Sequence, residues 1–445
     1  MTDKQTSFSH RETASASDAL RAIVNRNRSG AQVGTYAVCS AHPAVLDAAI
    51  QQALADGSML HVESTSNQVN QFGGYTGWTP AEFATQIRNA ADLAGLNSNR
   101  ILLGADHLGP YCWRAESASS AMANACELAA HSVLAGYQKI HLDASMACAD
   151  DPPILPEAVV AERAAAMCRA AEDTFSALPP GSPLPLYVIG TEVPVPGGEV
   201  TKGEAPAPTR LEDLEGTLDA FRSAFRTRGL DSAWERVVGI VVQPGVEFGE
   251  NSIFEYDRKK ARHLVEALPA SPELVYEAHS TDYQTPASLS SLVQDHFAIL
   301  KVGPWLTFAF REAVLALSLI ESEIPEYKKD ASQVRGALES EMLRNPAHWS
   351  PYYQGDPERL QFARTYSLSD RCRYYWPQEA VEQQLNRLLS HLNQPLPLAL
   401  LSQYLPMEYE AIRDGRIDNR ARDIIRYHIQ RVLRIYASAC GALAS

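Results

Sequence analysis

The chain has 445 residues, of which 45% are hydrophobic, so it can fill the core of one large domain or of two to three smaller ones. Its 39 Lys and Arg against 53 Asp and Glu give a net charge of -14. This balance excludes proteins that act mainly by neutralising nucleic-acid or membrane phosphates. Every apolar stretch is shorter than the 18 residues that a bilayer span requires, so we expect neither nucleic acid nor membrane among the partners.

The seven cysteines are scattered along the chain without a Cys-x-x-Cys pair. Such a pattern is poor for a disulfide framework or a thiolate zinc site and favours a reducing cytoplasm. Residues 1–17 lack the apolar segment of a signal peptide, and we expect them to form a disordered lead-in.

From residue 18 onwards, short apolar or β-branched runs alternate with stretches of helical periodicity. The eight runs are residues 33–39, 59–63, 100–104, 139–143, 186–192, 237–243, 274–278 and 297–302. Among the intervening helices we expect residues 80–96, capped by Thr79, and residues 256–268. Eight strand–helix units predict a TIM (β/α)8 barrel over residues 18–335. If one or two runs are miscounted, a doubly wound sheet is the alternative.

The alternation stops near residue 335, and residues 336–445 are predicted to form a C-terminal helical subdomain, with its first helix at 337–344 and its last at 420–436. This region is rich in arginine and aromatic residues. Tyr352, Tyr353, Tyr374, Tyr375 and Trp376 could pack as a seam against the barrel or form an oligomer contact, and the seam is favoured.

Polar residues stand at six successive strand ends, which meet at one mouth of such a barrel. His107, Glu192 and His279 are the ligand types expected for a divalent ion with an open coordination position, and Gln243 could fill or flank the fourth place. Zinc is the expected ion, with manganese as an alternative. Either histidine could instead be a hydrogen-bonded structural group.

Two carboxylates near these residues are candidates for catalysis. Asp106 could exchange a proton with a substrate hydroxyl, or it could only support His107. Asp143, with Ser145 two residues later, could orient these groups or bind a hydroxyl. Glu199 follows a Pro-rich Gly-Gly loop, and this loop is either a mobile lid that carries a catalytic acid or a solvated surface loop.

Other polar residues are candidates for substrate binding. The loops after the seventh and eighth strands offer Ser280, Thr281 and Lys301 for a phosphate group. Asn67 and Gln71 lie in an amide-rich segment that would suit a polyol, although an asparagine-stabilised turn is the alternative.

Nine segments of the chain resemble the signature blocks of the GatZ/KbaZ family. They are residues 39–43, 66–77, 104–110, 139–145, 190–199, 242–248, 276–285, 366–371 and 403–406. The family is described as the partner subunit of class II D-tagatose-1,6-bisphosphate aldolase, and members have also been labelled tagatose 6-phosphate kinase. The resemblance therefore implies a barrel of the class II aldolase type.

By this resemblance, the ligands are His107, Glu192 and His279, Glu199 is the mobile-loop acid, and Asp143 with Ser145 is the strand-four pair. Class II aldolases have a histidine where this chain has Gln243, so the resemblance leaves both the affinity for the metal and its identity open.

Three functions compete at this point. The chain could be a subunit that stabilises a catalytic aldolase partner in the catabolism of tagatose or galactitol. It could itself be a metal-dependent D-tagatose 6-phosphate 4-epimerase, since the residues for retro-aldol chemistry are present. An ATP-dependent kinase is third, because the sequence contains no GxxxxGK[ST] loop. Either of the first two functions is compatible with a homo-oligomer.

Overall fold

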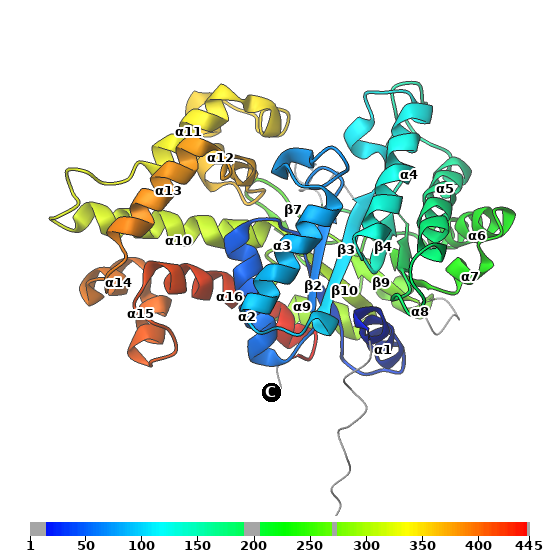
Figure 1. Cartoon of the computed structure of the whole chain (residues 1–445), viewed down its shortest axis with the longest axis horizontal. Coiled ribbons are helices and arrows are strands. Elements are labelled where there is room, and N and C mark those ends of the chain that lie inside the picture. Colours follow the sequence, from blue (N-terminus) through cyan, green and yellow to red (C-terminus); the bar gives the residue numbers. More distant parts are fainter. Residues whose placement is uncertain (1–14, 191–204, 269–273, 443–445) are drawn as a thin grey trace, which may run out of the picture.

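The computed structural model describes residues 15–190, 205–268 and 274–442. Within these residues, parallel strands close into a barrel in the order β1-β10-β9-β6-β5-β4-β3-β2 (Figure 1). The strands are β1 (Thr35–Val38), β2 (Leu60–Thr65), β3 (Ile101–Leu108), β4 (Lys139–Leu142), β5 (Leu186–Ile189), β6 (Val237–Val241), β9 (Val275–Ala278) and β10 (Phe297–Val302). All eight predicted strands are therefore confirmed, and so is the (β/α)8 barrel.

Helices follow each barrel strand and cover the outer face of the sheet (Figure 1). They are α2 (Pro43–Asp56), α3 (Pro80–Leu93), α4 (Ala118–Leu134), α5 (Glu157–Ser176), α6 (Leu211–Thr227), α7 (Asp231–Trp234), α8 (Arg262–Glu266), α9 (Pro286–Gln294) and α10 (Pro304–Glu323). Short 3-10 helices are η1 (Gly74–Thr76), η2 (Ser98–Arg100), η3 (Pro110–Trp113), η4 (Pro346–His348) and η5 (Arg371–Tyr375), and β7 (Glu247–Phe248) pairs with β8 (Ile253–Phe254) as an antiparallel hairpin.

Two predicted helices had different outcomes. The Thr79 cap of α3 is confirmed, because its side chain accepts the N–H of Glu82 while Glu82 accepts the N–H of Thr79. The helix predicted at residues 256–268 is wrong except for the short α8. The Asp257 carboxylate accepts the N–H of Lys259 and so stabilises a turn where that helix was expected to begin.

Helix α1 (Ala16–Arg28) packs across the amino ends of the strands (Figure 1). A capping box at Ser15 starts it, so residues 15–17 are folded and differ from the predicted disordered lead-in at residues 1–17 and from the predicted start of the barrel domain at residue 18. The remainder of that lead-in, residues 1–14, lies outside the described residues. Leu20 and Val24 of α1 pack into a cluster with Leu102 and Val188 from the barrel interior. The apolar face of α1 therefore closes the bottom of the barrel.

The C-terminal region is helical, as predicted, and joins the barrel through a shared core. It contains α11 (Val334–Arg344), α12 (Pro357–Tyr366), α13 (Glu379–His391), α14 (Leu398–Tyr404), α15 (Pro406–Arg413) and α16 (Ala421–Ala439). Helix α16 returns to pack against α2, α9 and α10. Tyr353, Tyr375 and Trp376 are buried, and the Trp376 ring lies 4.8 Å from that of Phe310 in α10. This packing agrees with the seam interpretation of the aromatic residues.

Each helix in the described residues is too short or too polar to cross a bilayer. All seven cysteines are unpaired.

Replacing Leu20 by Ala tests how much α1 contributes to stability. Leu20 is fully buried against the barrel interior, so L20A should lower the free energy of unfolding by about 2–5 kcal/mol. Urea denaturation followed by circular dichroism measures this loss. Leu93, which is 89% exposed on α3, is the matched control, and L93A should leave the midpoint unchanged. Equal midpoints for both variants would contradict the closing role of α1.

Candidate functional site

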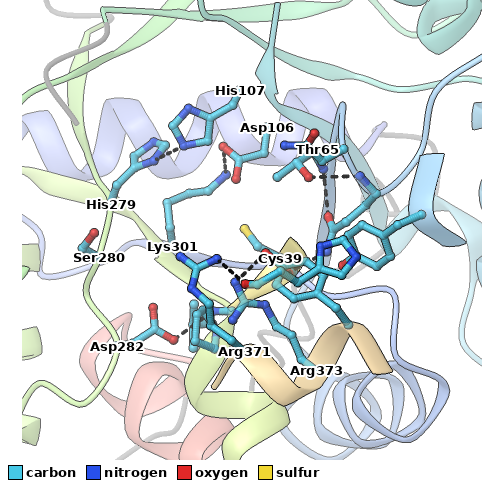
Figure 2. Close-up of a pocket in the computed structure, with 18 of the residues that line it drawn as sticks. Cys39, Thr65, Asp106, His107, His279, Ser280, Asp282, Lys301, Arg371 and Arg373 are labelled. Atoms are coloured by element: carbon cyan, nitrogen blue, oxygen red, sulfur yellow. Dashed lines mark hydrogen bonds and ion pairs between the residues drawn. The ribbon is translucent and has the colours of Figure 1, made fainter. Parts of the chain in front are cut away.

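A cavity of about 290 Å³ opens at the carboxyl ends of the barrel strands (Figure 2). One wall comes from the ends of β3, β9 and β10 and carries Asp106, His107, His279 and Lys301. The other wall comes from residues 347–374 of the C-terminal region. The site is therefore built jointly by the barrel and by a segment more than a hundred residues away in sequence from most of the barrel strands.

Local backbone geometry aims His107 into this cavity. Its φ of 45° is in the left-handed region, and the register between β3 and β4 shifts between Ala105 and Leu108. Directly after β3, Gly109 passes so close to the Asp143 carbonyl that a Cβ would lie 1.6 Å from the oxygen. The glycine is thus required for β3 and the end of β4 to approach each other beside the site.

His107 and His279 face each other inside the cavity (Figure 2). The Nε2 atom of His107 lies 3.1 Å from Nδ1 of His279. Behind them, His107 Nδ1 donates to Asp143 Oδ2 at 2.6 Å, and His279 Nε2 donates to Glu277 Oε1 at 2.9 Å. Two imidazole nitrogens bound to one tetrahedral zinc would be about 3.3 Å apart. The donor types, their spacing and the carboxylates behind them fit a divalent cation.

Beneath the histidine pair, a network of buried charges fills the centre of the barrel. Lys139 Nζ lies 2.6 Å from a Glu63 oxygen and 2.7 Å from a Glu277 oxygen. Lys301 pairs with Glu63 and lies 2.9 Å from Asp106 Oδ1. Two ammonium groups thus share three carboxylates, which leaves a local excess of negative charge below the histidines.

The buried charges and hydrogen bonds shift the protonation equilibria of the site. Burial would raise the pKa of Glu277, but Lys139 and His279 hold it at about 2. Burial would lower the pKa of His107, but the charge of Asp106 and the hydrogen bond to Asp143 outweigh it and raise the pKa to about 9. Burial would likewise raise the pKa of Asp106, yet His107 and its neighbours keep this carboxyl well below its usual range. Burial and the charge of His107 lower the pKa of His279, so the site favours positive charge on His107 and not on both histidines.

His141 and Glu277 also lie at the site, although neither is among the residues predicted from the sequence. Ligand atoms of Asp106, His141, Glu277 and His279 all lie within 4.8 Å of one another. His141 Nε2 donates to the Gly190 carbonyl at 3.0 Å, and its Nδ1 is 3.5 Å from Asp106. The available signal was the spacing of two residues, in Lys139-x-His141 and Glu277-x-His279, which places both members of each pair on the inner face of a barrel strand.

Several predicted substrate-binding residues have partners inside the protein. Thr281 Oγ1 donates to the Lys301 carbonyl at 2.6 Å, and Ser145 Oγ donates to Asp143 Oδ1 at 2.7 Å. Ser280 lines the cavity, with a left-handed φ of 52°, whereas the Lys301 ammonium points down into the buried network. The hydroxyl of Thr281 is therefore already used by the fold.

The other predicted site residues differ in whether they line the cavity. Asn67 lines the cavity, whereas Gln71 donates to the Asn124 carbonyl at 3.0 Å and is not part of the lining. Gln243 Oε1 accepts the N–H of Gly245 at 2.8 Å and is likewise not part of the lining, so the structure does not bring it to the histidine pair. Glu192 and Glu199 lie outside the described residues.

The second wall of the cavity was not predicted. It includes His348, Tyr352, Arg371, Arg373 and Tyr374. The sequence showed an Arg-rich aromatic stretch and a family block at residues 366–371, but neither feature indicates which part of the barrel the stretch contacts.

A family model described as D-tagatose-1,6-bisphosphate aldolase subunit GatZ/KbaZ-like matches residues 20–441. The chain belongs to this family. A crystal structure from Sinorhizobium meliloti 1021, described as a probable tagatose 6 phosphate kinase, is similar to the chain at 41% identity with a TM-score of 0.84. The match covers 92% of this chain and 100% of that one.

Two aldolase structures match more weakly. The YdjI aldolase of Escherichia coli K12 has 11% identity and a TM-score of 0.40, with 83% of this chain and 94% of that chain covered. A fructose-bisphosphate aldolase of Campylobacter jejuni has 12% identity and a TM-score of 0.43, with 89% and 94% covered. Both likenesses are too weak to bear on the function of this family member.

The carboxylates behind the histidine pair give a direct test of the metal site. Asp143→Asn and Glu277→Gln keep the shape of each side chain but remove the charge that orients the imidazole, so each should weaken zinc affinity about 10- to 100-fold. Competition with a chromophoric chelator measures the affinity. Asp213→Asn, on the outer helix α6, is the charge-matched control and should bind zinc as the native chain does. Undiminished affinity in both site variants would refute the assignment.

Proposed function

We propose that the barrel mouth is a metal-dependent aldol-type site for a sugar phosphate, in a chain that serves as a subunit of D-tagatose-1,6-bisphosphate aldolase. The observation that carries the proposal is the facing pair His107 and His279, each with its outer nitrogen bound to a carboxylate. A subunit that only stabilised a partner would have no need for such a pair. The family description supports the choice of reaction class.

His107 and His279 would hold the metal, for which zinc is the first candidate and manganese the second. Glu192 is proposed as a third ligand on the resemblance of its sequence block. A divalent cation at this place would polarise a substrate carbonyl and stabilise negative charge on its oxygen atoms.

Asp106 is the proposed acid–base residue. Its side chain is buried at the cavity wall and ion-paired with Lys301, so it is ionised. A carboxylate with so low a pKa accepts a proton only from a hydroxyl that is itself acidified in the site. Asp143 orients His107, and Ser145 in turn donates to Asp143, so both residues position the histidine.

A stand-alone D-tagatose 6-phosphate 4-epimerase is the second candidate. It is favoured by the fact that Asp106, His107 and His279 all come from this one chain, so the chemistry requires no second subunit for these groups. In this reaction Asp106 accepts the proton of the C4 hydroxyl as the C3–C4 bond breaks. Re-addition of C3 to the opposite face of the aldehyde, with return of the proton, yields fructose 6-phosphate.

We propose the cytoplasm as the place of action, because all seven cysteines remain unpaired. The proposed partners are the sugar phosphate and a catalytic class II aldolase subunit, with a homo-oligomer of this chain also compatible. A kinase is the least supported candidate, since the sequence has no phosphate-cradling loop of the nucleotide-binding type.

An assay run first without and then with ATP distinguishes these functions. The purified chain, with and without zinc or manganese, is incubated with tagatose 6-phosphate, and fructose 6-phosphate is followed by a coupled reaction. Metal-dependent product, abolished by His279→Ala, would support the epimerase. A rise in tagatose-bisphosphate cleavage only when a catalytic aldolase subunit is present, again lost in His279→Ala, would support the subunit role. Activity that needs ATP, or that is unaffected by His279→Ala, would contradict the proposal.

A further inference from the structure

We propose that Arg371 and Arg373 form the subsite that binds the phosphate group of the substrate, so that the C-terminal region selects phosphorylated over unphosphorylated sugars. The inference rests on the proposed function, because it assigns the two arginines to the same cavity. Both belong to η5, and both side chains line the cavity. Figure 2 shows the two guanidinium groups on the side of the cavity away from His107 and His279. Lys301 and Cys39 lie between the arginine pair and the histidine pair.

Tyrosine rings and backbone carbonyls hold the two guanidinium groups in place. Arg371 is 3% exposed, its guanidinium carbon lies 3.1 Å from the centre of the Tyr352 ring, and Nη1 donates to the His348 carbonyl at 3.3 Å. The Arg373 guanidinium carbon lies 4.5 Å from the centre of the Tyr374 ring. Stacking on tyrosine fixes the plane of each guanidinium, which lowers the conformational entropy lost on binding an anion.

Arg373 donates only to neutral oxygens among the described residues. Its Nη1 donates to the carbonyls of Ser369 and Asp370 at 2.5 and 3.1 Å, and Nη2 donates to the Tyr374 hydroxyl at 2.9 Å. Such bonds position the guanidinium without cancelling its charge. Burial lowers the pKa of Arg371, and the positive charge of Arg373 lowers it further. A dianion bound between the two groups would relieve this repulsion.

The other polar groups of the cavity are less suited to bind phosphate. The Lys301 ammonium, which the sequence predicted for this role, is neutralised by Glu63 and Asp106. Thr281 donates to a backbone carbonyl. Asp282 also lines the cavity, but its carboxylate accepts the N–H groups of Gly303 and Trp305 at 3.0 and 2.8 Å and so caps α10. Within the described lining, the positive charge that faces a ligand at this end is that of Arg371 and Arg373.

The chemistry of the substrate matches this division of the cavity. In a hexulose 6-phosphate the phosphate is on C6, whereas the aldol chemistry occurs at C3 and C4. A site for this substrate needs a metal-binding end and an anion-binding end that are separated by part of the sugar chain. Paired arginines are well suited to the second end, because each guanidinium can bind two phosphate oxygens at once.

The test uses the full-length, zinc-loaded chain and the variants R371Q and R373Q. Each variant should raise the KM for tagatose 6-phosphate about 10- to 100-fold, with a much smaller effect on kcat and with unchanged zinc content. R373K should recover part of the loss, since it restores the charge but not the planar fork. Binding of inorganic phosphate, measured by calorimetry, should be lost in R371Q and R373Q. Arg413, which is exposed on α15 and also bonds a tyrosine, is the matched control as R413Q.

Two readouts separate this inference from the proposed function. If the native chain turns over tagatose 6-phosphate and both variants keep its KM, the phosphate subsite is refuted while the proposed function stands. Suppose that the native chain neither turns over tagatose 6-phosphate nor raises tagatose-bisphosphate cleavage by a catalytic aldolase subunit, but binds inorganic phosphate through Arg371 and Arg373. The subsite then stands and the proposed function falls. Failure of the zinc-loaded native chain to bind inorganic phosphate overturns the subsite. R373Q decides the outcome if R371Q does not fold, because Arg373 is only partly buried.

Discussion

The structure depends on one electrostatic constraint, which is that each charge buried in the middle of the barrel must lie against a group of opposite charge. Lys139 and Glu277 are fully buried, and so is Glu63, which pairs with both lysines. Removing one partner from such a network typically costs about 3–5 kcal/mol, because an uncompensated charge remains buried. Most barrels of this kind fill their interior with branched apolar side chains. Here charged side chains lie in the interior directly below the histidine pair and contact it through Glu277.

The buried charge network explains how a few strands can hold the two histidines in position for a cation. Lys139 fixes Glu277, Glu277 accepts from His279, and His279 faces His107, so the ligand pair is connected to the buried network by direct contacts. The carboxylates also raise the pKa of His107. The C-terminal region adds the second wall, and α16 ties it to the barrel, since the Tyr436 hydroxyl donates to the Thr281 carbonyl. Barrel and helical region therefore form one functional unit.

The sequence was sufficient for the architecture because buried parallel strands are nearly continuous apolar runs, and all eight were visible as such. It was sufficient for the histidine pair because residues at the ends of parallel strands must converge. It failed for the helix at residues 256–268, where the periodicity of the segment concealed the turn at Asp257. Thr281 and Gln243 occur at strand ends as expected, yet local hydrogen bonds use their side chains, and such competition is invisible in a sequence.

The arginines of the second wall show the limit of sequence analysis most clearly. Whether Arg371 faces solvent, a partner or the barrel mouth depends on how residues far apart in the chain pack, and no local pattern determines this. The inward-facing residues Lys139 and His141 were detectable in principle from their spacing. Their role became apparent only once the barrel was closed and Glu277 lay opposite Lys139.

Crystals soaked in zinc and measured at its absorption edge test the central claim most directly. We expect one strong anomalous peak within bonding distance of both His107 Nε2 and His279 Nδ1. A zinc ion bound elsewhere in the chain, with these two nitrogens still in contact with each other, would contradict it.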